Sequence, residues 1–186
     1  MIPTASVASI KLLETPDLQS RLKKIKILIL DVDGVMTDGR VFWLAGHGWT
    51  RHFHIKDGYG IRILMKAGIQ VAVISGGDSE DVRTRMSFLK VNYVFLGDED
   101  KVTALNKIIQ ATGFTPEQMA FMGDELFDIP VIEKVGFSAT VPHAVDLVKA
   151  RAHYVTETPG GWGSVREVSD AILKAQRLFP YEGSGF

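Results

Sequence analysis

Short runs of consecutive apolar residues alternate along the chain with longer segments that are apolar on one face only. Continuous runs rich in β-branched residues are typical of parallel strands that are buried on both faces. The sequence predicts such strands at residues 25–32, 69–75, 92–96, 119–123 and 136–141. Helices are predicted around them at residues 17–24, 59–66, 79–89, 100–112, 126–134, 144–150 and 164–178. Alternating strands and helices indicate an α/β, Rossmann-like fold with one parallel sheet flanked by helices.

One segment breaks this alternation. Residues 39–56 place two apolar and aromatic arms around Gly46-His47-Gly48, a pattern typical of a β-hairpin. The arms contain four aromatic residues, Phe42, Trp43, Trp49 and Phe53. A solvated loop seldom keeps so much aromatic surface, so we expect the hairpin to project from the α/β unit and to contact another surface.

The composition is that of an ordinary globular protein, with 46% hydrophobic and 23% charged residues. The length of 186 residues predicts one domain over residues 1–186, including the hairpin and a C-terminal tail at 179–186. The net charge of −1 leaves no basic excess for binding nucleic acid or an anionic membrane. Without cysteine, disulfides and thiolate chemistry are excluded. We find no secretion signal or membrane-spanning apolar run, and expect a cytoplasmic location.

Acidic side chains follow the predicted strands at the points where those strands end. Asp31 and Asp33 follow the first strand, Asp124 follows the fourth, and Asp128 lies one helical turn later. The carboxyl ends of parallel strands form the edge of the sheet at which ligands bind. Clustered carboxylates repel one another unless a cation joins them, and hard oxygen ligands favour Mg²⁺.

Two further polar side chains are predicted at the same edge. Ser75 ends the second strand, and Lys101 follows the third. A divalent cation together with a lysine makes an anion site, for which phosphate is the obvious anion. Hydrolysis of a phosphate monoester requires an enzyme to lower the barrier by ~20 kcal/mol or more. A carboxylate nucleophile, a second acid, a metal ion and a lysine are sufficient for this chemistry.

These acidic, serine and lysine residues, in their order along the chain, resemble the four motifs of the haloacid dehalogenase superfamily of phosphohydrolases. The matching positions are Asp31-Val32-Asp33-Gly34-Val35, Ser75, Lys101 and Gly123-Asp124-Glu125-Leu126-Phe127-Asp128. Residues 31–39, 53–61 and 160–168 further resemble the sugar-acid phosphatases of this superfamily that act on 3-deoxy-D-manno-octulosonate 8-phosphate. Positions 31 and 75 are 44 apart, and positions 75 and 101 are 26 apart, which leaves no room for a cap domain.

The resemblance implies catalytic and phosphate-binding roles. Asp31 is expected to attack phosphorus and become an aspartyl-phosphate. Asp33 is expected to protonate the leaving sugar oxygen and then to activate water. Ser75, Gly76 and Lys101 are expected to hold the phosphoryl oxygens. A homotetramer is also implied, in which the hairpin and C-terminal tail of a neighbour cover each site.

The resemblance further implies a Mg²⁺ site and substrate contacts. Asp31, the backbone carbonyl of Asp33 and Asp124 are the expected metal ligands. Asp128 is expected to order the outer shell of the metal. The candidate substrate contacts are Lys56, Arg62 and Arg166.

The chain departs from the family pattern at two positions, and several structural interpretations stay open. Gly77 stands where the family often has Arg, and Glu125 where it commonly has Asp. The remaining motif residues also have non-catalytic explanations. Ser75 could cap a helix, Lys101 could be a surface lysine, Asp128 could favour a helix N-terminus, residues 160–163 could be a flexible turn, and Arg166 could be a surface residue.

Other functions also stay open. His47, His52 and His54 suggest a zinc site, although packing or contacts at the rim of the site are the simpler explanation. An alternative substrate is a nine-carbon keto-sugar-acid 9-phosphate. An alternative of another class is a non-catalytic oligomerisation module, like the phosphatase-like appendages of some sugar nucleotidyltransferases.

Overall fold

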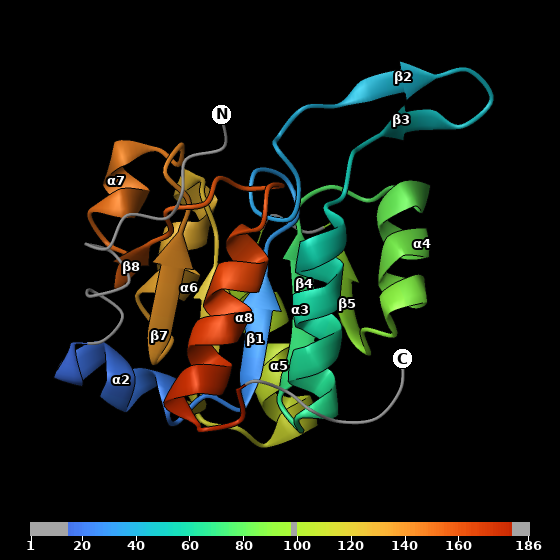
Figure 1. Ribbon diagram of the computed structural model, residues 1–186. Helices are drawn as coiled ribbons and strands as arrows, with labels where there is room; N and C mark the ends of the chain where they lie inside the picture. Colours follow the sequence, from blue (N-terminus) through green and yellow to red (C-terminus); the bar gives the residue numbers. More distant parts are fainter. Residues whose placement is uncertain (1–14, 98–99, 180–186) are drawn as a thin grey trace.

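The protein is built around a six-stranded parallel sheet with the strand order β5-β4-β1-β6-β7-β8 (Figure 1). The computed structural model describes residues 15–97 and 100–179. The strands are β1 (Ile27–Leu30), β4 (Gln70–Ser75), β5 (Tyr93–Leu96), β6 (Met119–Met122), β7 (Phe137–Thr140) and β8 (Tyr154–Val155). Because β1 pairs with both β4 and β6, the first strand lies in the middle of the sheet. The predicted α/β fold with a parallel sheet is confirmed.

Helices cover both faces of the sheet (Figure 1). One face packs against α2 (Pro16–Leu22), α3 (Ile55–Lys66), α4 (Glu80–Leu89) and α8 (Ser164–Ala175). The other packs against α5 (Lys101–Thr112), α6 (Ile129–Ile132) and α7 (Asp146–Lys149). Alternate residues of β1 serve the two faces: Leu28 and Leu30 join the first apolar cluster, Ile27 and Ile29 the second. This double burial explains why the strand is apolar at every position. None of the helices in the described residues is both long and apolar enough to cross a bilayer.

Several elements are shorter than predicted or begin elsewhere. Strand β1 ends at Leu30, so Asp31 already belongs to the following loop. The helix predicted at 126–134 is a 3₁₀ turn, η2 (Leu126–Asp128), followed by the single turn α6, because Pro130 cannot donate a helical hydrogen bond. The helix predicted at 144–150 is the single turn α7. Helix α3 begins at Ile55, four residues earlier than predicted, and η1 (Pro116–Gln118) and β8 were not predicted.

The hairpin projects from the α/β unit as a separate two-stranded sheet (Figure 1). Its strands are β2 (Phe42–Leu44) and β3 (Gly48–Thr50), which pair antiparallel with Trp43 opposite Trp49. The predicted range 39–56 is wrong at its end, since residues 55–56 form the first turn of α3. Between β1 and β4 the chain forms the hairpin and α3 alone, so no cap domain is inserted there.

The half-buried carboxylate of Glu167 ties the last helix to the segment that leads to it. Its Oε1 accepts the hydroxyl of Tyr154 at 2.7 Å and the N–H of Glu157 at 3.0 Å. Its Oε2 accepts the N–H of Thr158 at 2.9 Å. One side chain on α8 therefore satisfies three donors that follow the start of β8.

Replacing this carboxylate should destabilise the fold. The variant Glu167→Ala leaves three donors without their acceptor, so we expect the free energy of unfolding to fall by about 2–4 kcal/mol. Glu133→Ala is the matched control, because Glu133 lies in an exposed pair with Arg151, and should change it by less than about 0.5 kcal/mol. Urea unfolding followed by circular dichroism measures both. Equal stabilities for the two variants would contradict the prediction.

Candidate active site

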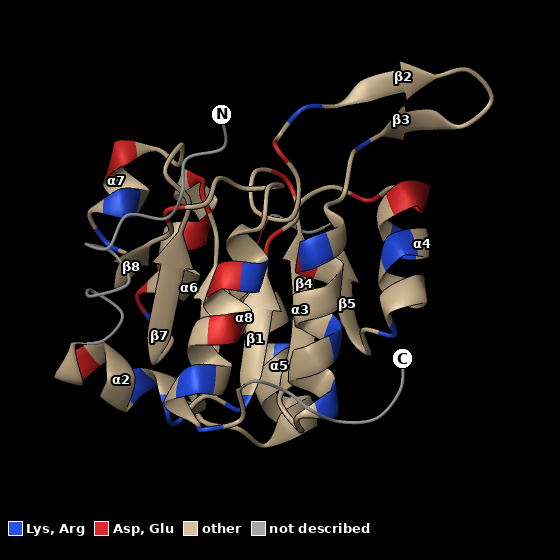
Figure 2. Ribbon diagram, viewed as in Figure 1, with Lys and Arg blue, Asp and Glu red and all other residues tan. Residues whose placement is uncertain are grey.

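Acidic residues gather in the loops at the carboxyl ends of the strands, as predicted (Figure 2). Asp31 directly follows β1, and its backbone N–H donates to the carbonyl of Met122 at 2.9 Å, which continues the pairing with β6. Asp124 and Asp128 lie in the loop and the short 3₁₀ turn after β6. The loops after the neighbouring central strands β1 and β6 therefore place these carboxylates at the same edge of the sheet.

Lys101 is buried between two of these carboxylates. Its Nζ donates to Asp31 Oδ1 at 2.7 Å and to Asp128 Oδ1 at 2.5 Å. The side chain of Lys101 is 0% exposed. The alternative that Lys101 is a surface lysine is therefore wrong. The same ammonium lies 4.5 Å from the ring centroid of Phe127, which adds a cation–π contact.

Asp128 organises the loop after β6 with its second oxygen. Its Oδ2 accepts the backbone N–H of Asp124 at 2.9 Å and of Glu125 at 3.1 Å. A Cβ on Gly123 would lie 2.4 Å from Cγ of Asp128, so only glycine fits there. Asp128 thus does more than favour a helix N-terminus: it joins the loop to Lys101. Glu125, one of the departures from the family pattern, accepts the N–H of Leu126 and caps the 3₁₀ turn.

The acidic cluster has the donor set of a divalent cation site. Asp31, Asp124 and Asp128 each offer an oxygen, and these atoms lie within 4.8 Å of one another. Oδ1 of Asp124 is buried and has no hydrogen-bond partner. A Cβ on Gly34, which has φ +87°, would lie 2.0 Å from Oδ2 of Asp124, so the carboxylate lies directly on the glycine backbone. Carboxylate oxygens with an unpartnered buried atom fit Mg²⁺ well.

The crowding of the carboxylates changes their acidity. Burial raises the pKa of Asp31 to about 7, although the neighbouring ammonium of Lys101 lowers it. Burial also raises the pKa of Asp124 to about 7, and the charges of Asp31 and Asp128 raise it further. A bound cation would stabilise the ionised forms of both groups.

Asp33, the proposed acid and base, has a partner that the sequence did not reveal. Arg51, one residue beyond β3, donates from Nε to Asp33 Oδ1 at 2.5 Å and from Nη2 to Oδ2 at 3.1 Å. Ser75 is buried at the end of β4 and is followed by the half-buried Gly76. Ser75 Oγ accepts the N–H of Gly77 at 3.3 Å, so its oxygen orders the loop that continues from the strand.

The glycine-rich segment before α8 packs against the loop that carries Asp33. A Cβ on Gly160 would lie 1.7 Å from the carbonyl oxygen of Gly34, and Gly161 N–H donates to Val35 O at 3.0 Å. His143 Nε2 also lies 3.1 Å from the carbonyl oxygen of Gly34. The segment is thus a fitted wall of the site, and the alternative of a merely flexible turn is wrong.

The three candidate substrate contacts lie in different surroundings. Lys56 is exposed on the first turn of α3, while Arg62 is half-buried about 10 Å further along that helix. The guanidinium of Arg166 pairs with Asp170 at 2.7 Å and lies 5.2 Å from the ring centroid of Tyr59. Lys56 therefore lies at the carboxyl edge of the sheet, while the guanidinium of Arg166 is held between Asp170 on α8 and Tyr59 on α3.

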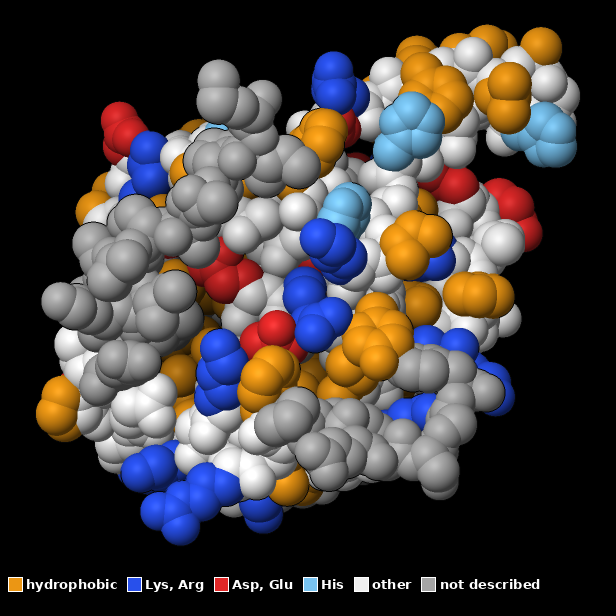
Figure 3. Space-filling model, viewed as in Figure 1, with side chains coloured by type: hydrophobic (Ala, Val, Ile, Leu, Met, Phe, Trp, Pro, Cys, Tyr) orange, Lys and Arg blue, Asp and Glu red, His pale blue; other side chains and the backbone are white. Residues whose placement is uncertain are grey.

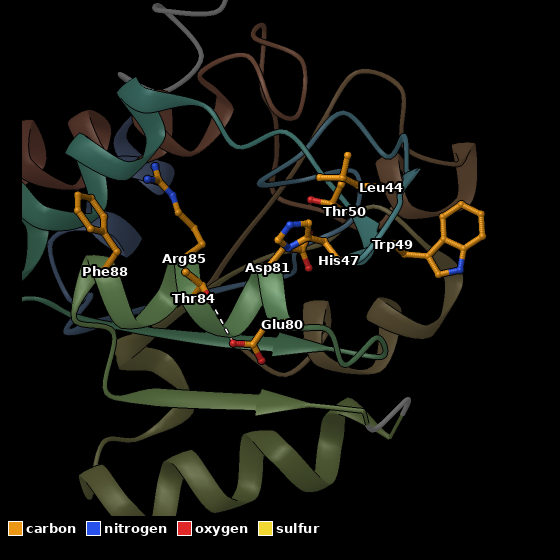
Figure 4. A pocket seen from close by; sticks show the side chains of 9 residues that line it. All are labelled: Leu44, His47, Trp49, Thr50, Glu80, Asp81, Thr84, Arg85 and Phe88. Atoms are coloured by element: carbon orange, nitrogen blue, oxygen red, sulfur yellow. Dashed lines mark hydrogen bonds between the residues drawn. The ribbon is translucent and has the colours of Figure 1, made fainter.

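The hairpin exposes apolar side chains beside a groove. Hydrophobic atoms gather on its surface in Figure 3, and Trp43 and Trp49 are 62% and 57% exposed. Figure 4 shows the groove of about 510 Å³ between the hairpin and α4, with Arg85 among its lining side chains. Its lining residues are Leu44, His47, Trp49, Thr50, Glu80, Asp81, Thr84, Arg85 and Phe88. Of the predicted tail 179–186, residues 180–186 lie outside the described residues.

The hairpin histidines do not form a metal site in the described part of the chain, where the acidic cluster is the one group with metal-binding geometry. His52 packs against Phe42 with the two rings tilted by 44° and their centroids 4.9 Å apart. His54 Nδ1 lies 3.9 Å from Oδ2 of the buried Asp57. The zinc hypothesis therefore gives way to packing.

Comparisons with known proteins identify the family. A family model described as haloacid dehalogenase-like hydrolase matches residues 80–165. The 3-deoxy-D-manno-octulosonate 8-phosphate phosphatase KdsC of Haemophilus influenzae is 43% identical over 159 residues, covering 86% of this chain and 88% of its own. The chain belongs to this phosphatase family. The enzyme of that name from Escherichia coli K12 is 39% identical over 160 residues, covering 86% of this chain and 85% of its own.

Solved structures of phosphatases from this family have the same fold. The Yersinia pestis phosphatase superposes with a TM-score of 0.85 at 40% identity, covering 87% of this chain and 88% of its own. The Moraxella catarrhalis phosphatase, crystallised with a magnesium ion, a phosphate ion and a KDO molecule, gives a TM-score of 0.86 at 34% identity. That comparison covers 89% of this chain and 95% of the other.

The raised pKa values predict that Mg²⁺ binding weakens as the pH falls below 7. Asp31 and Asp124 must be ionised to bind a cation, and below a pKa of about 7 protons compete for them. Affinity should fall about tenfold per pH unit for each proton displaced. Isothermal titration calorimetry at about pH 6 and about pH 8, in two buffers of different ionisation enthalpy, measures affinity and proton release.

The exposed Asp146 on α7 supplies the control. Asp146→Asn should keep the full pH dependence, whereas Asp124→Asn should lose most of the binding. An affinity that is unchanged between the two pH values would show that the pKa values of the cluster are not raised.

Proposed function

We propose that this phosphatase hydrolyses 3-deoxy-D-manno-octulosonate 8-phosphate to 3-deoxy-D-manno-octulosonate and phosphate, with Mg²⁺ as its cofactor. The observation that carries the proposal is the buried bridge of Lys101 to Asp31 and Asp128, next to the unpartnered oxygen of Asp124. Relatives of about 40% identity over most of the chain carry the same activity in their names. A phosphate monoester of a sugar acid supplies the anion that such a site binds.

In the proposed mechanism, Asp31 attacks phosphorus along the line of the bond to the sugar oxygen. The new bond joins phosphorus to a carboxylate oxygen of Asp31 as the phosphorus–sugar oxygen bond breaks. Protonated Asp33 gives its proton to the departing sugar oxygen. The resulting Asp33 carboxylate then takes a proton from water, which attacks the aspartyl-phosphate and releases phosphate.

The other site residues hold charge in place during both steps. Ser75, Gly76 and Lys101 are proposed to hold the phosphoryl oxygens through a hydroxyl, a backbone N–H and an ammonium. Asp31, the backbone carbonyl of Asp33 and Asp124 would hold Mg²⁺. The cation supplies positive charge that stabilises the phosphoryl oxygens as negative charge develops on them. Asp128 is proposed to order the outer shell, since its Oδ2 already orders the backbone around Asp124.

The substrate is tested by phosphate release from a panel of sugar phosphates. The eight-carbon 8-phosphate should have the highest kcat/KM, with activity lost in excess EDTA and restored by Mg²⁺. Ca²⁺ should inhibit, because its looser coordination disturbs the in-line geometry. Asp31→Asn is the control for background hydrolysis and should lower kcat by about 10⁴-fold or more, because it removes the nucleophile.

Each other outcome favours a different function. A preference for the nine-carbon 9-phosphate would replace the substrate and keep the mechanism. Activity of Asp31→Asn within tenfold of the unmodified enzyme would refute the assigned nucleophile. Absence of hydrolysis across the panel would favour a non-catalytic oligomerisation module.

We also propose that the enzyme is a cytoplasmic homotetramer in which a neighbour covers each site. A site for phosphoryl transfer works best when bulk water is excluded, and the chain inserts no cap between β1 and β4. The exposed tryptophans of the hairpin and the groove beside them supply an apolar surface for a second copy. The cysteine-free chain fits a reducing compartment.

Polar substitutions on the hairpin test the assembly. The double variant Trp43→Ser/Trp49→Ser should dissociate the tetramer and lower kcat/KM by about tenfold or more, since each such anchor contributes at least about 1–2 kcal/mol. Leu147→Ser, at a 49% exposed leucine on α7, is the control and should stay tetrameric. Multi-angle light scattering measures the mass. A fully active monomer would contradict the proposal.

A further inference from the structure

The hairpin contributes one side chain to the catalytic edge, namely Arg51. Its guanidinium fork meets the carboxylate of Asp33 with two hydrogen bonds, from Nε to Oδ1 at 2.5 Å and from Nη2 to Oδ2 at 3.1 Å. The side chain of Arg51 is 9% exposed, whereas that of Asp33 is 40% exposed. The geometry is the planar, bidentate pairing for which arginine is suited and lysine is not.

The third nitrogen of the guanidinium is fixed to the start of α4. Arg51 Nη1 donates to Ser79 Oγ at 2.8 Å and lies 3.3 Å from Oδ1 of Asp81. Ser79 is the residue before α4, and Asp81 lies in its first turn. Arg51 is therefore anchored to the rigid α/β unit on one side while it holds Asp33 on the other.

The loop after β4 runs beside this guanidinium. A Cβ on Gly77 would lie 3.5 Å from Nη2 of Arg51 and 3.7 Å from Oδ2 of Asp33. Both distances are ordinary van der Waals contacts, so Gly77 lies directly beside the ion pair of Arg51 and Asp33.

We propose that Arg51 is a positioning residue that orients the protonated carboxyl group of Asp33 for proton transfer to the leaving oxygen. The inference rests on the role proposed above for Asp33. A carboxylate exposed by 40% would otherwise rotate among several rotamers, and a group misplaced by about 1 Å can lose about 10²-fold in rate. The fork binds one lone pair of each oxygen and leaves a second position on each oxygen free, one of which holds the proton that passes to the leaving group. Because Arg51 directly follows β3, the hairpin itself sets this orientation.

Substrates with different leaving groups distinguish a positioning role of Arg51 from phosphate binding or from simply holding the hairpin. A sugar alkoxide needs a proton to depart, whereas p-nitrophenolate departs without one. A residue that orients the proton donor should therefore matter for the sugar-acid 8-phosphate and hardly for p-nitrophenyl phosphate. A residue that binds phosphate, or that only holds the hairpin in place, should matter equally for both substrates.

The experiment compares kcat/KM for these two substrates in matched variants. Arg51→Gln should lower kcat/KM by about 10- to 100-fold for the sugar-acid phosphate and by less than about threefold for p-nitrophenyl phosphate. Arg51→Lys keeps the charge without the fork and should recover only part of the loss. Arg83→Gln is the control, since Arg83 pairs with Asp78 on the exposed side of the same region, and should change neither value by more than about twofold.

Asp33→Asn in the same assay separates the two proposals. The inference is supported if Asp33→Asn shows the same selective loss and Arg51→Gln adds nothing to it in the double variant. If Asp33→Asn lowers kcat/KM for the sugar-acid phosphate alone and Arg51→Gln does not, the inference is overturned and the role of Asp33 stands. If Asp33→Asn lowers kcat/KM equally for both substrates, the role proposed for Asp33 is refuted, and the inference is refuted with it. Full recovery in Arg51→Lys would also overturn it, since charge alone would then suffice.

Discussion

The burial of one ammonium group between two carboxylates is the constraint from which the rest of the site follows. Lys101 is 0% exposed, and an unpaired charge at such depth would cost several kcal/mol. Its partners Asp31 and Asp128 lie in loops after different strands, and Lys101 begins a helix after a third. The bridge therefore joins three crossovers of the sheet. Together with Asp124, the cluster holds three carboxylates for one ammonium, and a bound cation would compensate the remaining negative charge.

Because the carboxylates of the site lie so close together, the backbone of several glycines packs directly against the side chains and carbonyls around them. Gly34 and Gly123 touch the carboxyl groups of Asp124 and Asp128 so closely that a methyl group would overlap with them. Gly160 packs equally closely against the carbonyl oxygen of Gly34. These glycines carry no reactive group, yet they decide where the reactive groups lie. We regard them as part of the site for that reason.

The sequence predicted those features that rest on local pattern and strand topology. Continuous apolar runs located the five longer strands, and Asp31, Lys101 and Asp124 were placed at one edge because parallel strands end there. Arg51 was not predicted, since no local pattern shows which hairpin side chain folds back onto Asp33. The packing of the segment around Gly160 is not predicted for a similar reason, because a sequence does not show what a glycine touches. Its neighbour Arg166 had a usable signal in the spacing to Asp170, which suits an ion pair along a helix.

The distribution of tryptophan has a practical consequence. All three tryptophans of the chain, Trp43, Trp49 and Trp162, are more than half exposed, and none belongs to the two apolar clusters. Trp43 and Trp49 face each other edge to face across the hairpin, with ring centroids 5.5 Å apart. Tryptophan fluorescence therefore reports on the hairpin and on the loop before α8, while the interior of the sheet contributes no tryptophan signal. A blue shift of the emission would register the covering of the rim without any label.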